Sequence, residues 1–157
     1  MGSEGSELTN ILKLLNRLDA KVLAREIATI MSLDPFSVFE TLSISEAVEI
    51  MIENKISSIL VVDENNKLKG IFTERDALVK IATSKVVDIA KTQISSFMTA
   101  NPHVERGSLS IAAALNIMVK RKFRHLPIVD EAGNVIGIVS VMDVMAFLAR
   151  EIFNETP

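Results

Sequence analysis

An internal repeat is the feature of this chain that most constrains its fold. Residues 42–51 and residues 109–118 both begin Leu-Ser-Ile and both end Ile-Met. Further identities follow at the same spacing without a gap: Met31 with Met98, Pro35 with Pro102, Lys55 with Lys122, Val62-Asp63-Glu64 with Val129-Asp130-Glu131, Gly70-Ile71 with Gly137-Ile138, and Asp76 with Asp143. The chain is therefore a tandem duplication preceded by an N-terminal extension.

Each copy predicts the element order β-α-β-β-α. In the first copy, Ser43 followed by Glu46 forms the pattern of a capping box, which predicts a helix running to about Asn54. The run of β-branched residues that follows is typical of a buried strand. The elements expected in the first copy are a strand over 37–41, a helix over 44–54, strands over 57–63 and 68–72, and a helix over 74–82. Those expected in the second copy are a strand near 104–107, a helix over 111–121, strands over 124–130 and 135–139, and a helix over 141–150.

Composition excludes several classes of protein. With 48% hydrophobic and 24% charged residues, most of the chain is too apolar to be disordered, and no stretch reaches the about 20 apolar residues of a membrane span. The absence of cysteine excludes disulfides, cysteine-based zinc sites and thiol catalysis, and two histidines are too few for a histidine-rich metal site. A net charge of −3 argues against a generic binder of nucleic acid or anionic membranes.

The N-terminal extension predicts an amphipathic helix over residues 8–25. Its apolar residues follow helical spacing at Leu8, Ile11, Leu12, Leu15, Leu18 and Val22. We expect this helix to cover a face of the chain or of a dimer partner. Docking of a peptide or a membrane surface is the alternative, although the basic polar face typical of membrane-surface helices is missing. Residues 1–7 form a polar leader, expected to be disordered and without a secretory signal.

A short motif recurs where a strand of each copy is expected to pass into a helix. Residues 70–76 and 137–143 share the form Gly-apolar-x-Thr/Ser-x-x-Asp. A hydroxyl at such a place can donate to phosphate, and a carboxylate one turn later can accept from the vicinal hydroxyls of a ribose. Helix capping alone also explains the hydroxyl and the acid, but it does not explain the glycine, which permits close approach of a ligand or of backbone.

The duplication and the two motifs resemble a cystathionine β-synthase (CBS) domain pair, also called a Bateman module. Residues 123–130, Ile30-Met31 and Phe97-Met98 are also similar to this family's pattern. The resemblance implies an α/β (α+β) fold in which two β-α-β-β-α units pack sheet to sheet with pseudo-twofold symmetry and leave two ligand clefts. The implied boundaries are unit 1 at 26–83, a linker at 84–96, unit 2 at 97–151 and a tail at 152–157.

The resemblance also implies roles for individual residues. Asp76 and Asp143 would bind ribose hydroxyls, while Thr73 and Ser140 would contact ribose or phosphate. The remaining implied phosphate contacts are Arg75, Arg124 and His125, and the implied adenine contacts are Leu42, Ala47 and Leu68 for the cleft of Asp143 and Leu109, Ala114 and Val135 for the cleft of Asp76. In the first copy, the positions of Arg124 and His125 are held by Ser57 and Ser58, so the clefts are expected to be unequal.

These observations predict a cytoplasmic, non-catalytic regulatory module without a metal or a catalytic cofactor. It is expected to bind AMP, ADP or ATP, to form a homodimer, and to signal to an effector protein in trans. Two alternatives stay open: a sensor of S-adenosylmethionine, and a dimeric scaffold whose clefts are empty. A nucleic-acid adaptor or a membrane protein is not expected, given the acidic isoelectric point of 5.4 and the absence of an apolar span.

Overall fold

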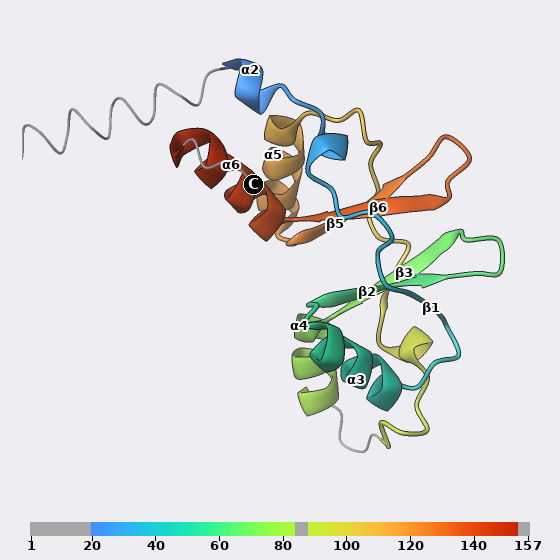
Figure 1. Cartoon of the computed structure of the whole chain (residues 1–157). Helices are drawn as coiled ribbons and strands as arrows, with labels where there is room; N and C mark the ends of the chain where they lie inside the picture. Colours follow the sequence, from blue (N-terminus) through green and yellow to red (C-terminus); the bar gives the residue numbers. More distant parts are fainter. Residues whose placement is uncertain (1–19, 84–87, 154–157) are drawn as a thin grey trace, which may run out of the picture. The chain divides into compact units, whose positions relative to one another are not determined.

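The computed structural model describes residues 20–83 and 88–153 (Figure 1). The helix expected over 8–25 lies outside these residues except for its end, where α2 (Ala20–Leu23) is helical. The leader 1–7, residues 84–87 of the expected linker and residues 154–157 of the tail also lie outside them.

The first copy folds in the order expected from its sequence. Its elements are β1 (Ser37–Phe39), α3 (Ile44–Asn54), β2 (Ser58–Val62), β3 (Leu68–Thr73) and α4 (Glu74–Asp76), which continues as the π-helix η2 (Ala77–Ile81). The predicted capping box is present, because the Ser43 hydroxyl accepts from the Glu46 backbone and the Glu46 carboxylate accepts from the Ser43 N–H. Lys55 ends α3 in the left-handed conformation.

The second copy contains α5 (Ile111–Arg121), β5 (His125–Val129), β6 (Val135–Ser140) and α6 (Val141–Phe153). The strand expected near 104–107 is wrong, since Glu105 makes only an isolated parallel bridge to Ile128. In the first copy the Leu60 N–H donates to the Phe36 carbonyl, but the matching residue in β5 is Pro127, which has no N–H. The sequence analysis also missed the two-residue strand β4 (Thr99–Ala100).

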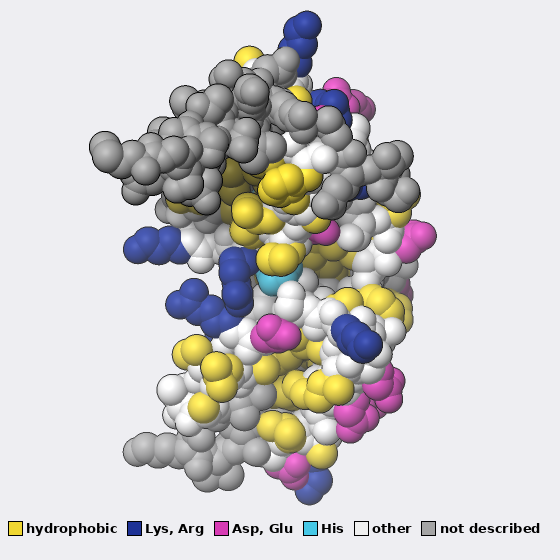
Figure 2. Space-filling view, turned by 60° about the vertical axis from the view of Figure 1, so that its left-hand side comes forward, with side chains coloured by type: hydrophobic (Ala, Val, Ile, Leu, Met, Phe, Trp, Pro, Cys, Tyr) yellow, Lys and Arg dark blue, Asp and Glu magenta, His cyan; other side chains and the backbone are white. Residues whose placement is uncertain are grey.

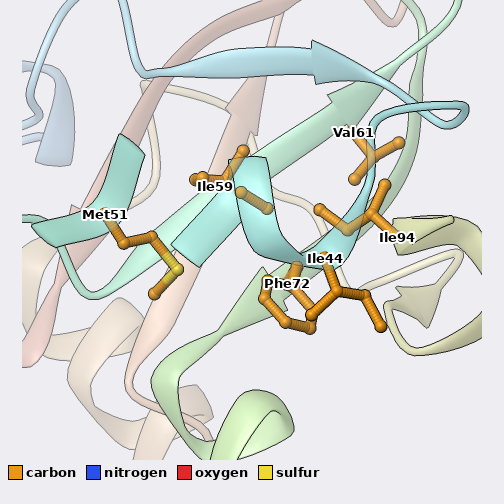
Figure 3. Close-up of a cluster of buried hydrophobic side chains, with 7 residues drawn as sticks. Ile44, Met51, Ile59, Val61, Phe72 and Ile94 are labelled. Carbon is orange, nitrogen blue, oxygen red and sulfur yellow. The ribbon is translucent and has the colours of Figure 1, made fainter. Parts of the chain in front are cut away.

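Strands β1 to β4 form one sheet in that order, with β1 parallel to β2 and the other pairs antiparallel. Helix α3 buries its apolar face against this sheet, as Figure 3 shows for the side chains around Phe72. The buried members of this cluster are Ile44, Ala47, Met51, Ile59, Val61, Phe72 and Ile94. Strands β5 and β6 form a two-stranded sheet.

The chain divides into two compact units, and neither unit is one continuous stretch. The terminal unit comprises the described residues of 1–31, 107–126 and 139–157, and the central unit comprises those of 32–106 and 127–138. The boundaries predicted for the sequence repeats, 26–83 and 97–151, stay a prediction.

Backbone hydrogen bonds show why the units interleave the two repeats. In the terminal unit, Ile27 donates to Leu109 and Ile111 donates to Arg25, so the segment leading into the first copy lies on the first turn of α5. In the central unit the equivalent bonds run from Ile94 to Leu42 and from Ile44 to Thr92, where η3 (Ile94–Ser96) lies beside the start of α3. The segment that precedes each copy is therefore hydrogen-bonded to the start of the other copy's first helix.

The hairpin turns of the two copies also meet within the central unit. Val135 donates to the Asn66 carbonyl, Asn66 Nδ2 donates back to Val135, and Lys67 Nζ donates to the Ala132 carbonyl. A small apolar cluster adjoins these turns, formed by the buried residues Leu60, Val62, Ile71 and Val135.

The carboxylates of Asp63 and Asp130 accept hydrogen bonds from backbone N–H groups within these hairpin turns. Their pKa values predict how the stability of the fold depends on pH. The Lys67 N–H holds the pKa of Asp63 below its ordinary value, and the Asn134 N–H does the same for the pKa of Asp130. Because both folded-state pKa values are depressed, the unfolded chain binds more protons than the folded chain in acid. The two ionised carboxylates therefore stabilise the fold at pH values above the unfolded-state pKa. This contribution to the free energy of unfolding is lost as the pH falls through the folded-state pKa.

We therefore expect the melting temperature to fall as pH drops below about 4. The Asp63→Asn, Asp130→Asn double variant should show a flatter dependence than the wild-type chain, measured by circular dichroism. Glu53→Gln, an exposed change on α3, is the matched control and should leave the profile unaltered. Parallel profiles for the wild type and the double variant would contradict the assignment.

Candidate functional site

The first strand-to-helix motif is closed by a reciprocal capping box between Thr73 and Asp76. Asp76 Oδ2 accepts from the Thr73 N–H at 3.0 Å and from Thr73 Oγ1 at 2.7 Å. In return, Thr73 Oγ1 accepts from the Asp76 N–H at 3.2 Å. The Thr73 hydroxyl donates its one proton to the carboxylate. It can therefore form further hydrogen bonds only as an acceptor.

The second motif has the same geometry. Asp143 Oδ2 accepts from the Ser140 N–H at 2.7 Å and from Ser140 Oγ at 2.6 Å. Ser140 Oγ accepts from the Asp143 N–H at 3.2 Å. Capping therefore accounts for both hydroxyls and for one oxygen of each acid, which was the alternative left open by the sequence.

The second oxygen of each acid is not needed for the cap. Asp76 Oδ1 accepts from Lys80 Nζ at 2.9 Å. Asp143 Oδ1 has no hydrogen-bond or ion-pair partner within residues 20–83 and 88–153. The structure thus leaves one carboxylate oxygen per motif directed away from the capping interaction.

Gly70, which capping could not explain, has an intramolecular reason. A Cβ at this position would clash with Met98 Sδ and would lie 2.9 Å from Met98 Cγ. Gly70 is buried in β3 opposite β4, where it is paired with Ala100. The glycine of the first motif is therefore accounted for by close packing of a methionine side chain within the central unit and does not by itself indicate a ligand.

The residues expected to contact phosphate differ in their surroundings. Arg75 is exposed on α4, and its counterpart in α6 is Met142, which is 73% exposed and carries no charge. Arg124 is exposed, and its carbonyl accepts from the Val141 N–H at the start of α6. His125 is half-buried as the first residue of β5.

The residues expected to contact adenine are apolar and partly or wholly buried. Ala47 and Ala114 have no exposed surface, and Val135 is 9% exposed. Leu42, Leu68 and Leu109 are half-buried. Their contact with a ligand stays a prediction, as do the roles of the ribose and phosphate residues.

Metal-binding groups and membrane-spanning helices are both absent from the described residues. Residues 20–83 and 88–153 contain no group of three or more histidine, aspartate or glutamate side chains that could hold a metal ion. Over the same residues, no helix is long and apolar enough to cross a membrane.

Comparison with known proteins assigns the family. The profile of the CBS domain matches residues 24–83 and again 94–150. The chain belongs to the CBS domain family. CBS domain pairs are generally regulatory, non-catalytic modules, and the expected mixed α and β fold with two CBS copies is confirmed.

Curated relatives include both small and large proteins. An uncharacterized 17.7 kDa protein in the bps2 3′ region of Acidianus ambivalens is 33% identical over 122 residues, which is 78% of this chain and 72% of that protein. The inosine-5′-monophosphate dehydrogenase of Nitrosopumilus maritimus is 34% identical over 116 residues, which is 74% of this chain but only 23% of the enzyme.

Two similar solved structures contain adenosine compounds. The CBS domain pair of protein MJ0100, in complex with 5′-methylthioadenosine and S-adenosyl-L-methionine, has a TM-score of 0.72 and 28% identity over 80% of this chain and 97% of that one. CBSX2 in complex with AMP has a TM-score of 0.70 and 26% identity over 80% of this chain and 96% of that one.

The contact between Gly70 and Met98 generates a prediction. Gly70→Ala should destabilise the fold by about 1–3 kcal/mol, because the added methyl group overpacks a filled site. At this chain length that is a fall in melting temperature of roughly 2–12 °C. Circular dichroism is the measurement, since the chain has no tryptophan or tyrosine.

The double variant Gly70→Ala, Met98→Ala tests the cause. Removing the thioether vacates the space for the methyl group, so Gly70→Ala should cost less in the Met98→Ala background than in the wild type. An equal cost in both backgrounds would show that the glycine is needed for another reason.

Proposed function

We propose that this chain is a regulatory module without catalytic activity, which binds an adenosine-containing ligand through Asp76 and Asp143. AMP, ADP and ATP are the first candidates, and S-adenosylmethionine is the alternative. Binding would alter the populations of conformations that an effector protein senses in trans. The expected cytoplasmic location is part of the same proposal.

One observation carries the proposal most directly. In both motifs the cap uses only Oδ2 of the aspartate, which leaves Oδ1 as an acceptor beyond the cap. A carboxylate oxygen accepts hydrogen bonds only, which suits the vicinal hydroxyls of a ribose. Relatives of the same fold that hold AMP, 5′-methylthioadenosine and S-adenosyl-L-methionine support adenosine as the shared part of the ligand.

A ligand of this kind should stabilise the fold. At about 100 times its dissociation constant, a ligand adds about 2.7 kcal/mol, which corresponds to a rise in melting temperature of roughly 5–10 °C. The test is thermal unfolding followed by circular dichroism with AMP, ADP, ATP and S-adenosylmethionine in turn. No rise with any of them at millimolar concentration would refute the proposed function.

Substitution of the acids separates ligand binding from capping. Asp143→Asn keeps one oxygen for the cap and places an amide where the outward oxygen was. The loss of a hydrogen bond to a charged acceptor should weaken one site about ten- to a hundred-fold in calorimetric titration. Asp76→Asn should weaken the other site.

Glu46→Gln is the matched control for these substitutions. The Ser43–Glu46 capping box has the same geometry, with Glu46 Oε2 accepting from the Ser43 N–H at 3.0 Å and from Ser43 Oγ at 2.6 Å. This substitution should alter the stability of α3 and leave ligand affinity unchanged. Unaltered affinity in both aspartate variants would leave capping as the whole role of the two acids.

A dimeric scaffold with empty clefts is the second candidate function. Exposed apolar side chains favour dimerisation. Figure 2 shows hydrophobic side chains at the surface of one face. Leu78 is 72% exposed, Met142 is 73% exposed and Met145 is 52% exposed. Only a contiguous apolar patch marks an interaction site, so these exposed side chains are candidates for burial by a partner, which substitution tests.

We expect the full chain to sediment as a homodimer of about 34 kDa, twice the chain mass of 17.2 kDa. Met142→Glu together with Leu78→Glu should shift the equilibrium toward the monomer, because charge opposes the burial of these positions. Lys21→Glu, on the exposed surface of α2, is the control. A monomer at micromolar concentration would contradict dimerisation.

A further inference from the structure

Lys80 distinguishes the two ribose acids of this chain. Its ammonium group lies 2.9 Å from Asp76 Oδ1, 2.6 Å from the Phe97 carbonyl oxygen and 3.4 Å from the Met98 carbonyl oxygen. All three oxygens are acceptors, and an ammonium group has donors only. The Asp76 side chain is 12% exposed and that of Lys80 is 38% exposed, so the pair is partly shielded from water.

The second motif has no equivalent of this lysine. The residue one turn beyond Asp143 is Phe147, which is 4% exposed and whose ring centroid lies 5.4 Å from the guanidinium carbon of Arg25. An aromatic ring cannot donate to Asp143 Oδ1 as a lysine can. The two motifs are therefore alike in their caps and different in the residue that follows each acid by four positions.

The two aspartates differ in the number of acceptor positions that stay open to a ligand. In each aspartate, Oδ2 already accepts two hydrogen bonds from the cap, which fills its two lone pairs. Asp76 Oδ1 has one position left beside Lys80 Nζ, whereas both positions of Asp143 Oδ1 are open within the described residues. Asp143 can therefore accept both hydroxyls of a ribose, while Asp76 can accept only one.

We propose that Lys80 weakens the Asp76 ribose site by occupying its outward carboxylate oxygen, so that Asp143 forms the tighter of the two sites. This inference rests on the proposed function, because it concerns the same two acids. Lys80 acts through Asp76 and is a specificity-determining residue. The lysine would have to withdraw from Asp76 before a second ribose hydroxyl could bind there.

The first test uses the wild-type chain and needs no substitution. Adenosine is the probe because it has no phosphate, so the charge of Lys80 does not attract it. Titrations are followed by NMR through the amide signals of Asp76 and Asp143, which report the two motifs separately. We expect adenosine to bind at least about tenfold more tightly at Asp143.

The hydroxyl count is tested with 3′-deoxyadenosine. Relative to adenosine, it should lose about tenfold in affinity at Asp143, where both hydroxyls are accepted, and less than about threefold at Asp76. Equal losses at the two acids, or tighter binding of adenosine at Asp76, would overturn the inference.

Lys80→Met tests the lysine itself, because methionine retains an unbranched apolar side chain and removes the donor. Adenosine should bind about tenfold more tightly at Asp76 in this variant, and 3′-deoxyadenosine should now lose affinity there as it does at Asp143. Lys91→Met is the matched control, since Lys91 pairs with Asp88 at 3.2 Å and neither is a site residue. It should change neither site.

The outcomes distinguish this inference from the proposed function. If adenosine binds both motifs but Lys80→Met leaves the Asp76 site unchanged or weaker, the inference is overturned and the proposed function stands. If adenosine shifts neither amide in the wild type or in Lys80→Met, the inference is overturned. The proposed function falls with it only if AMP, ADP, ATP and S-adenosylmethionine also fail to raise the melting temperature.

Discussion

The exchange of leading segments between the two repeats is the interaction on which the rest of the structure depends. The backbone from Arg25 to Ile27 bonds to the residues that begin α5, and η3 bonds to the residues that begin α3. Ile27 and Ile94, which occupy equivalent positions, are both completely buried by this arrangement. Each helix thus obtains part of its core from the other copy, so neither copy has a complete core of its own.

The exchange also fixes the surroundings of the first motif. Ile94 joins the core around Phe72, and the backbone that follows it brings Met98 against Gly70 and the carbonyls of Phe97 and Met98 against Lys80. Lys80 in turn reaches Asp76. The acid of the first motif is therefore linked to the exchanged segment through the Lys80 side chain. Occupation of Asp76 by a ligand that displaces Lys80 would alter the bonds that hold this segment.

Much of the fold could be predicted from the sequence because its signals are local. The capping box of Ser43 and Glu46 and the strand-helix periodicity of both copies set the bounds of α3, α5 and the paired strands nearly as observed. The absence of the strand expected near 104–107 could not be predicted from those residues alone. It depends on the missing N–H of Pro127, which lies in another strand. β4 was missed because two residues carry no periodicity.

The candidate site was predictable only in part. The repetition of Thr73 with Asp76 and of Ser140 with Asp143 was enough to locate both motifs and to raise capping as an alternative. The role of Gly70 depends on Met98, and that of Lys80 depends on the carbonyls of residues 97 and 98. Both are contacts across the fold that spacing along the chain does not reveal. Lys80 could have been noticed from its place four residues after Asp76, which is one helical turn.

The central claim is that the two capped acids bind the ribose of an adenosine compound, and equilibrium dialysis tests it most directly. The full chain is dialysed against a mixture of AMP, ADP, ATP and S-adenosylmethionine, and the retained compounds are quantified. Saturable retention of at least one compound is predicted, with its loss in an Asp76→Asn, Asp143→Asn variant whose circular dichroism matches the wild type. Retention of none, or the same retention by the double variant, would contradict the claim.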